Sequence, residues 1–337
     1  MNDLRGPVFI GGLDRSGKTT MRAFLASHPN IAIPAVGSNM ETYFYGRYGD
    51  LADPANLERC LHAMLRYKHV RFLKPDPDRI RREFAQGAPT YERLFALFLM
   101  HFAEAQGKPR WGAQTGLIER YADQLFGAYP GVRVIHMVRD PRDRYEASLA
   151  LWPGGNGLAG GATARWRYSV ALAERNLGRY PDGYLIVRFE DMVREPEATV
   201  SRVCVFIGED YDPAMLAMPE APKHVDLLRK GADAGETPLS EGFIGRFRGR
   251  IPPRELAYMQ LHAGRKMRAY GYEPEPQHLS WRDRAGFVAY EWPRQTARMA
   301  AWRGVEELQQ RFPTRVARTP GSRMIVEDTP AEQEVAT

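Results

Sequence analysis

The chain has 337 residues, a net charge of +6 at neutral pH and a hydrophobic content of 44%, which excludes global disorder. Its two cysteines exclude a disulfide framework and a cysteine zinc site, and no stretch approaches the roughly 18 apolar residues of a membrane span. No basic run is dense enough to indicate nucleic-acid binding. We therefore expect a cytoplasmic protein that binds no nucleic acid.

The first predicted elements are a strand at residues 8–10 and a helix that begins near Met21, and between them lies the stretch GGLDRSGKTT. The segment from Gly12 to Thr19 fits the phosphate-binding pattern G-x-x-x-x-G-K-[ST]. Glycines let the backbone N–H groups turn toward one anion, and the helix N-terminus adds a partial positive charge. The side chain of Lys18 adds a full positive charge. The sequence therefore predicts a phosphate-binding loop here.

Apolar β-rich runs and helical stretches alternate along the next two hundred residues. Strands are predicted at 132–138 and 184–189, and helices at 91–105, 163–179 and 196–207. The strands are apolar on both faces, which is typical of buried parallel strands. We therefore predict an α/β fold with a doubly wound parallel sheet, whose binding loops lie at the carboxyl ends of the strands.

The composition changes after Gly271. A proline-rich linker and an arginine-rich stretch with helical spacing cover 273–312, and polar and small residues dominate 313–337. We predict an α/β domain at 1–272, a helical extension at 273–312 and a flexible tail at 313–337.

A second anion-binding segment follows the strand at 132–138 in the sequence VIHMVRDPRDRYEASLA. Arg139 lies at the carboxyl end of the strand, and Ser148 follows nine residues later in the predicted helix. A ligand with phosphate groups at both ends would use this segment together with the first loop. A P-loop kinase would instead need an acidic Mg²⁺ ligand here, and Asp140 is the best candidate for it.

These two segments resemble the cofactor signatures of the sulfotransferase family, which uses 3′-phosphoadenosine-5′-phosphosulfate (PAPS) and releases the bisphosphate PAP. The stretch GFIGRFRGRIPPREL resembles a third family segment, and the resemblance covers about residues 7–272. It implies that the first loop holds the 5′ end of PAPS and that the later segments hold the 3′-phosphate. The implied 5′ contacts are Arg15, Ser16, Gly17, Lys18, Thr19 and Thr20, and the implied 3′ contacts are Arg139, Ser148 and either Arg246 or Arg248.

The sequence departs from the family pattern at three places. Lys18 replaces the first threonine of the usual loop, and the spacing from Arg139 to Ser148 is one residue longer than usual. Gln114, in WGAQTG, stands where bacterial members often carry a lysine. We hypothesise that Lys18 supplies the missing positive charge from the opposite side.

The resemblance also indicates a catalytic base. Glu41 lies in ETYFY, which resembles the E-x-H-F-F segment of the carbohydrate sulfotransferases, whose glutamate removes the acceptor proton. This chemistry needs no metal, and none of the eight histidines lies at metal-ligand spacing from acids or cysteines.

The leading hypothesis is a PAPS-dependent sulfotransferase that transfers a sulfuryl group by in-line displacement to a hydroxyl of a small-molecule, lipid or saccharide acceptor. The alternatives are a P-loop kinase that uses Mg-ATP, and a non-catalytic nucleotide-binding relative. The sequence leaves open the acceptor, the oligomeric state (a homo-oligomer included) and the role of the C-terminal extension.

Overall fold

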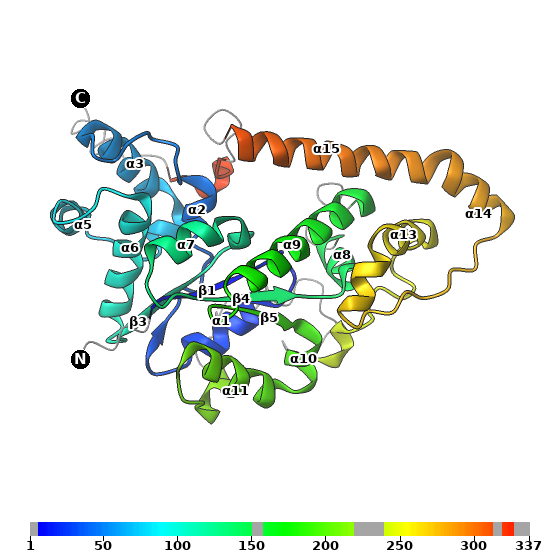
Figure 1. Cartoon of the computed structure of the whole chain (residues 1–337), viewed down its shortest axis with the longest axis horizontal. Helices are drawn as coiled ribbons and strands as arrows, with labels where there is room; N and C mark the ends of the chain where they lie inside the picture. Colours follow the sequence, from blue (N-terminus) through cyan, green and yellow to red (C-terminus); the bar gives the residue numbers. More distant parts are fainter. Residues whose placement is uncertain (1–5, 150–157, 219–238, 313–318, 327–337) are drawn as a thin grey trace.

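The computed structural model describes residues 6–149, 158–218, 239–312 and 319–326. Its centre is a five-stranded parallel sheet with the strand order β2-β3-β1-β4-β5 (Figure 1). The strands are β1 (Val8–Gly12), β2 (Ile31–Ala32), β3 (Arg110–Gln114), β4 (Arg133–Val138) and β5 (Tyr184–Arg188). The predicted fold class is confirmed.

The three predicted strands are present as β1, β4 and β5, whereas β2 and β3 have no counterpart in the prediction. β2 spans two residues, and β3 reads RWGAQ, so neither contains an apolar run. β3 nevertheless lies next to β1, where Ile10 pairs with Gln114.

Helices cover both faces of the sheet, as Figure 1 shows for α9 on one side and α10 and α11 on the other. Phe9 of β1 belongs to the core under α6, whereas its neighbours Val8 and Ile10 belong to the core under α1 and α11. The helices named so far are α1 (Lys18–Ala26), α6 (Tyr91–Ala105), α9 (Ala159–Arg179), α10 (Phe189–Arg194) and α11 (Pro196–Ile207). Because both faces are buried, β1 is apolar throughout and β4 is apolar except for Arg133 and His136.

Further helices surround this core. Those before β4 are α2 (Met40–Tyr43), α3 (Pro54–Arg66), α4 (Lys68–Arg71), α5 (Pro77–Phe84), η1 (Ile118–Tyr121) and α7 (Ala122–Ala128). Those after β4 are α8 (Pro141–Leu149), η2 (Pro213–Ala217), η3 (Glu241–Phe243), α13 (Pro253–Ala269) and η5 (Ser322–Met324). No helix within the described ranges is long and apolar enough to cross a membrane.

The helical extension lies along the α/β domain. It consists of α14 (Trp281–Gly286), the π-helical η4 (Phe287–Glu291) and the long α15 (Trp292–Arg311), which runs beside α9 (Figure 1). Buried Met299 packs in one cluster with Ala159 and Ala162 of α9, and buried Glu306 forms an ion pair with Arg120 of η1. The extension therefore contributes to the core.

Part of the predicted flexible tail is also in contact with the domain. Ile325 pairs with Tyr67 in an isolated antiparallel bridge, and the Val326 amide donates to the Arg66 carbonyl at 2.8 Å. Residues 313–318 and 327–337 of that tail lie outside the described residues. The domain boundaries themselves stay a prediction.

The close packing of α15 against α9 predicts how a substitution at their contact changes the stability of the protein. α9 begins four residues before its predicted start, and a Cβ at Gly160 would lie 2.1 Å from the Gln295 carbonyl oxygen of α15. Gly160→Ala should therefore lower the free energy of unfolding by about 1–3 kcal/mol, measured by urea denaturation.

The control is Gly161→Ala, because a Cβ at Gly161 has no neighbour within 4 Å. This variant should be neutral or more stable by up to about 1 kcal/mol. Equal stabilities of the two variants would contradict the close packing of α15 on α9.

Candidate active site

The phosphate-binding loop connects β1 to α1 at the carboxyl edge of the sheet. Gly12, Arg15 and Gly17 adopt left-handed backbone conformations with φ of 101°, 69° and 88°. A Cβ at Gly12 would lie 2.2 Å from the Met137 carbonyl oxygen of β4, so only glycine fits there. The loop therefore turns tightly against β4, and Ser16, Lys18 and Thr20 are buried along it. Successive amides in such a turn form a concave anion-binding surface.

Lys18 folds back over this loop. Its Nζ donates to the Gly12 carbonyl at 2.9 Å and to Asp14 Oδ1 at 3.3 Å, which forms an ion pair within the loop. The same ammonium would lie 3.4 Å from a Cβ at Gly116, just after β3. The positive charge of Lys18 therefore lies between the loop and the end of β3.

Gln114 reaches the same place from β3. Its Nε2 donates to Thr19 Oγ1 at 3.4 Å, and its buried Oε1 has no hydrogen-bond partner among the described residues. The position at which bacterial relatives often carry lysine thus faces the helix that Lys18 begins. This proximity is what the hypothesis of a relocated charge requires.

Glu41 is buried in α2 on the far side of Gly116. Its Oε2 accepts a hydrogen bond from Thr115 Oγ1 at 3.3 Å, and Thr115 also bonds Ser38 Oγ at 3.0 Å. Burial raises the pKa of Glu41 to about 7, against the opposing effect of its hydrogen bonds to the backbone and Thr115. A carboxylate with this pKa can both accept and release a proton at neutral pH.

Arg139 joins the second anion segment to the first. Its guanidinium donates to the Arg15 carbonyl at 3.1 Å and to the Phe243 carbonyl at 2.7 Å, and it stacks on the Phe189 ring. Burial lowers the pKa of Arg139, which acidic neighbours led by Asp143 raise. Its Nε has no hydrogen-bond partner among the described residues.

Arg246 belongs to the same cationic cluster. It lies over the Phe243 ring and faces Glu146 with 3.5 Å between Nε and Oε1. The pKa of Arg15 is lowered by burial and by the charges of Arg139 and Arg246. Arg15, Arg139 and Arg246 therefore converge, although the last is more than one hundred residues from either of the others in sequence.

Ser148 and Arg248 have other partners. The Ser148 hydroxyl donates to the Tyr145 carbonyl within α8 at 2.7 Å, and the exposed Arg248 binds Glu275. No contact within the described ranges joins either side chain to Arg139. Of the two arginines that the sequence left open, the geometry groups Arg246 with the 3′-phosphate segment, and roles for Ser148 and Arg248 stay predictions.

Two aspartates that the motif analysis did not assign as cofactor contacts organise this segment. Asp140 binds Arg142 through both carboxylate oxygens, at 2.7 Å for the closest pair. Asp143 accepts from the amides of Gly245 and Phe247 at 2.7 and 2.9 Å, and burial raises its pKa to about 6. Asp143 thereby holds the Arg246 turn against α8. The only sequence feature that indicates this role of Asp143 is the second aspartate of RDPRD.

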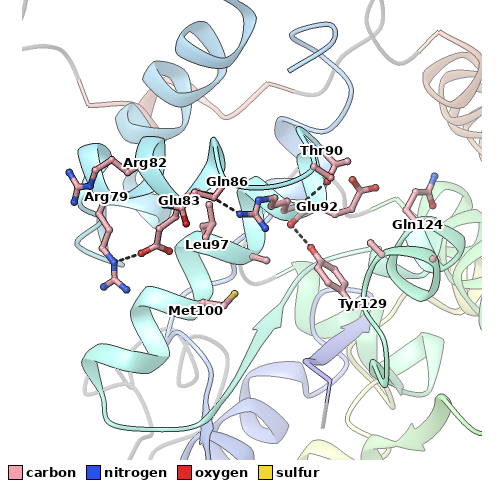
Figure 2. A pocket seen from close by; sticks show the side chains of 15 residues that line it. Arg79, Arg82, Glu83, Gln86, Thr90, Glu92, Leu97, Met100, Gln124 and Tyr129 are labelled. Atoms are coloured by element: carbon pink, nitrogen blue, oxygen red, sulfur yellow. Dashed lines mark hydrogen bonds and ion pairs between the residues drawn. The ribbon is translucent and has the colours of Figure 1, made fainter. Parts of the chain in front are cut away.

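Two cavities lie near the domain surface. One of about 1120 Å³ lies among α5, α6 and α7. Figure 2 shows hydrogen bonds at its lining, among them Arg79 with Glu83 and Tyr129 with the Glu92 carbonyl. None of the predicted site residues lines it. The other, of about 290 Å³, is lined by Thr42, the residue after Glu41, together with Tyr168 of α9 and Gln310 of α15.

Comparison with known proteins gives a consistent result. Residues 7–213 match the sequence model described as "Sulfotransferase family". The sulfotransferase domain of the Synechococcus PCC 7002 olefin synthase superposes with a TM-score of 0.53 at 21% identity, covering 80% of this chain and 95% of that one. The sulfotransferase domain of the curacin biosynthetic pathway has a TM-score of 0.50 at 16% identity, covering 80% and 99%. These two likenesses show the shared fold.

Curated relatives match at similar identity. A Drosophila melanogaster protein-tyrosine sulfotransferase is 22% identical over 260 residues, which is 73% of this chain and 47% of that protein. Human carbohydrate sulfotransferase 5 is 25% identical over 166 residues, which is 42% of this chain and 40% of that protein. The matched parts thus span less than half the length of these relatives.

The raised pKa of Glu41 predicts a pH-dependent effect on stability. A glutamate whose pKa is higher in the folded state stabilises the protein most at low pH, and this contribution disappears as the pH rises toward 7. Glu41→Gln should therefore gain about 2–3 kcal/mol of unfolding free energy relative to wild type between pH 5 and pH 8. Urea denaturation at both pH values measures this change.

The exposed Glu197 of α11 provides the control, and Glu197→Gln should show no such gain. A constant difference between Glu41→Gln and wild type across this pH range would contradict the raised pKa.

Proposed function

Because this chain belongs to the sulfotransferase family, we propose that it transfers the sulfuryl group of PAPS to a hydroxyl group of an acceptor and releases PAP. The observation that carries this proposal is the convergence of two anion-binding segments with a buried carboxylate. The phosphate loop lies between the cluster of Arg139 and Arg246 on one side and the Thr115–Glu41 pair on the other.

The residues present fit a ligand with phosphate groups at both ends. Backbone amides of residues 15–20 would hold the 5′-phosphosulfate at the start of α1, where the helix dipole favours an anion. Arg139 and Arg246 would hold the 3′-phosphate. Burial lowers the pKa of Arg15, and Arg139 and Arg246 lower it further because their positive charges repel that of Arg15. An anion bound among the three arginines would offset this repulsion and their loss of hydration.

The reaction then needs little beyond alignment and one proton transfer. As the acceptor oxygen bonds to sulfur, Glu41 accepts the hydroxyl proton on its carboxylate. The electron pair of the broken sulfur–oxygen bond stays on the 5′-phosphate of the leaving PAP. Lys18 and the loop amides stabilise that growing negative charge, as preorganised donors do in other group transfers.

The other two hypotheses fit the geometry less well. Asp140, the best candidate Mg²⁺ ligand for a kinase, already accepts hydrogen bonds from Arg142 at both of its carboxylate oxygens. A non-catalytic relative would have no use for a buried glutamate with a pKa near neutrality beside the loop.

The 290 Å³ cavity is our candidate for the acceptor. It begins at Thr42, whose hydroxyl lies 3.5 Å from the Gly116 carbonyl, and α15 forms its outer wall. Tyr45, Tyr121 and Tyr168 provide ring surfaces, and arginine and glutamine side chains provide hydrogen-bonding groups. A saccharide or a phenol meets these requirements. With this assignment, the C-terminal extension would help to form the acceptor site through α15. The cytoplasmic location of the protein stays a prediction.

The role of Glu41 predicts a change in the pH profile of turnover. Glu41→Gln should lower kcat/KM for PAPS-dependent transfer by about 10²-fold or more, because the acceptor proton loses its base. Wild-type kcat/KM should rise with pH through a pKa of about 7, and this rise should be absent in the variant. Glu197→Gln is the control, and an unchanged profile in Glu41→Gln would contradict the assignment.

The relocated charge predicts a separation of turnover from binding. Lys18→Thr restores the residue usual in the family loop, but the neighbouring side chain on β3, Gln114, carries no charge that could replace that of Lys18. The kcat of Lys18→Thr should fall by about 10²-fold or more, while its affinity for PAP stays within about threefold of wild type. Turnover and calorimetric titration measure the two effects, with Lys266→Thr on α13 as control. Normal turnover of Lys18→Thr would refute the hypothesis.

A further inference from the structure

Arg144 is a buried arginine whose guanidinium has no hydrogen bond or ion pair with any residue that the structure describes. It lies on α8, where its side chain is 5% exposed. Arg142, two residues earlier, is bound by Asp140 and Gln260, and Arg139 donates to two carbonyl oxygens. In contrast, no hydrogen bond or ion pair joins the Arg144 guanidinium to any described residue, and its Nε is buried without an acceptor.

Such a group is costly to the fold. Burial lowers the pKa of Arg144 to about 10, and only the partial compensation by Asp14 opposes this effect. The side chain nevertheless remains positively charged at neutral pH. An unpaired buried charge destabilises a protein by several kcal/mol, so an oxyanion bound at this place would satisfy it.

The charges that act on Arg144 are those of Asp14, which attracts it, and of Arg165 and Arg139, which repel it, so the side chain lies beside the phosphate loop between these groups. Asp14 is the acid that attracts it most, and the same carboxylate attracts Lys18 and Arg165. Asp14 and Lys18 both lie against Gly116, the residue after the threonine that bonds Glu41. One carboxylate is thus shared by three cations at the end of the loop that faces the base.

Helix α9 connects this cluster to the candidate acceptor cavity. Arg165 precedes Tyr168 by three residues and Leu172 by seven, which places all three on one face of the helix. Tyr168 and Leu172 line the 290 Å³ cavity. An acceptor that extends along this face would reach Arg165 and then Arg144.

We propose that Arg144 and Arg165 form a subsite for an anionic group of the acceptor, a carboxylate, phosphate or sulfate ester close to the hydroxyl that is sulfated. The subsite rests on the proposed function, because that function makes this side of the loop the acceptor side. The donor's own phosphates are served by the loop amides, Arg15, Arg139 and Arg246.

Calorimetric titration of inorganic sulfate into the PAP-saturated full-length protein tests the subsite. Wild type should bind sulfate, and Arg144→Met should weaken that binding by about tenfold or more while the affinity for PAP stays within about threefold. Arg144→Met should also unfold at the same or a higher temperature than wild type, because it removes an unpaired buried charge. A structural role would lower that temperature.

Three further variants distinguish the groups that could bind the sulfate. Arg165→Met should weaken sulfate binding as Arg144→Met does, and Arg167→Met on the same helix should leave it unchanged. If Lys18→Met abolishes sulfate binding and Arg144→Met does not, the anion occupies the sulfuryl position and the subsite is refuted. A PAP affinity that falls about tenfold or more in Arg144→Met would assign the arginine to the donor and also overturn the proposal.

The same titrations distinguish an error in the proposed function from an error in the proposed subsite. Wild-type protein that binds no PAP would contradict that function, and a titration of sulfate without PAP would still compare wild type with Arg144→Met. Equal sulfate affinities in that comparison would overturn the subsite.

Discussion

The site depends on the absence of a side chain at Gly12. The Met137 carbonyl of β4 occupies the position where a Cβ would be, so the loop after β1 can turn directly against the neighbouring strand. Arg139, two residues after Met137, then reaches the loop and donates to the Arg15 carbonyl. Two anion-binding segments that lie more than one hundred residues apart in sequence become one surface through this close approach.

The charges around the loop are divided into groups with different tasks. Arg15, Arg139 and Arg246 are gathered where phosphate groups would bind, and Asp143 fixes the turn that carries Arg246. Glu41 lies apart from them behind Thr115, and its burial disfavours the charged form. In the proposed mechanism, the cations that would bind the anionic donor and the carboxylate that would accept a proton therefore lie at the same sheet edge without neutralising each other.

Much of this arrangement was predictable from sequence, and the failures have physical causes. Apolar runs identified β1, β4 and β5, but β2 is too short and β3 too polar to give that signal. The helix predicted to begin at residue 163 begins at Ala159, and Gly160 within it lets α15 approach closely. The near-neutral pKa of Glu41 and the lowered pKa of Arg144 follow from tertiary burial, which no local pattern encodes.

The most direct test of the account is a calorimetric titration of the purified protein with PAP and, separately, with ATP plus Mg²⁺. The account predicts micromolar or tighter binding of PAP that is lost in Arg139→Ala, because the 3′-phosphate distinguishes PAP from other nucleotides. Binding of Mg-ATP with no binding of PAP would contradict it and would mean that the loop serves a kinase.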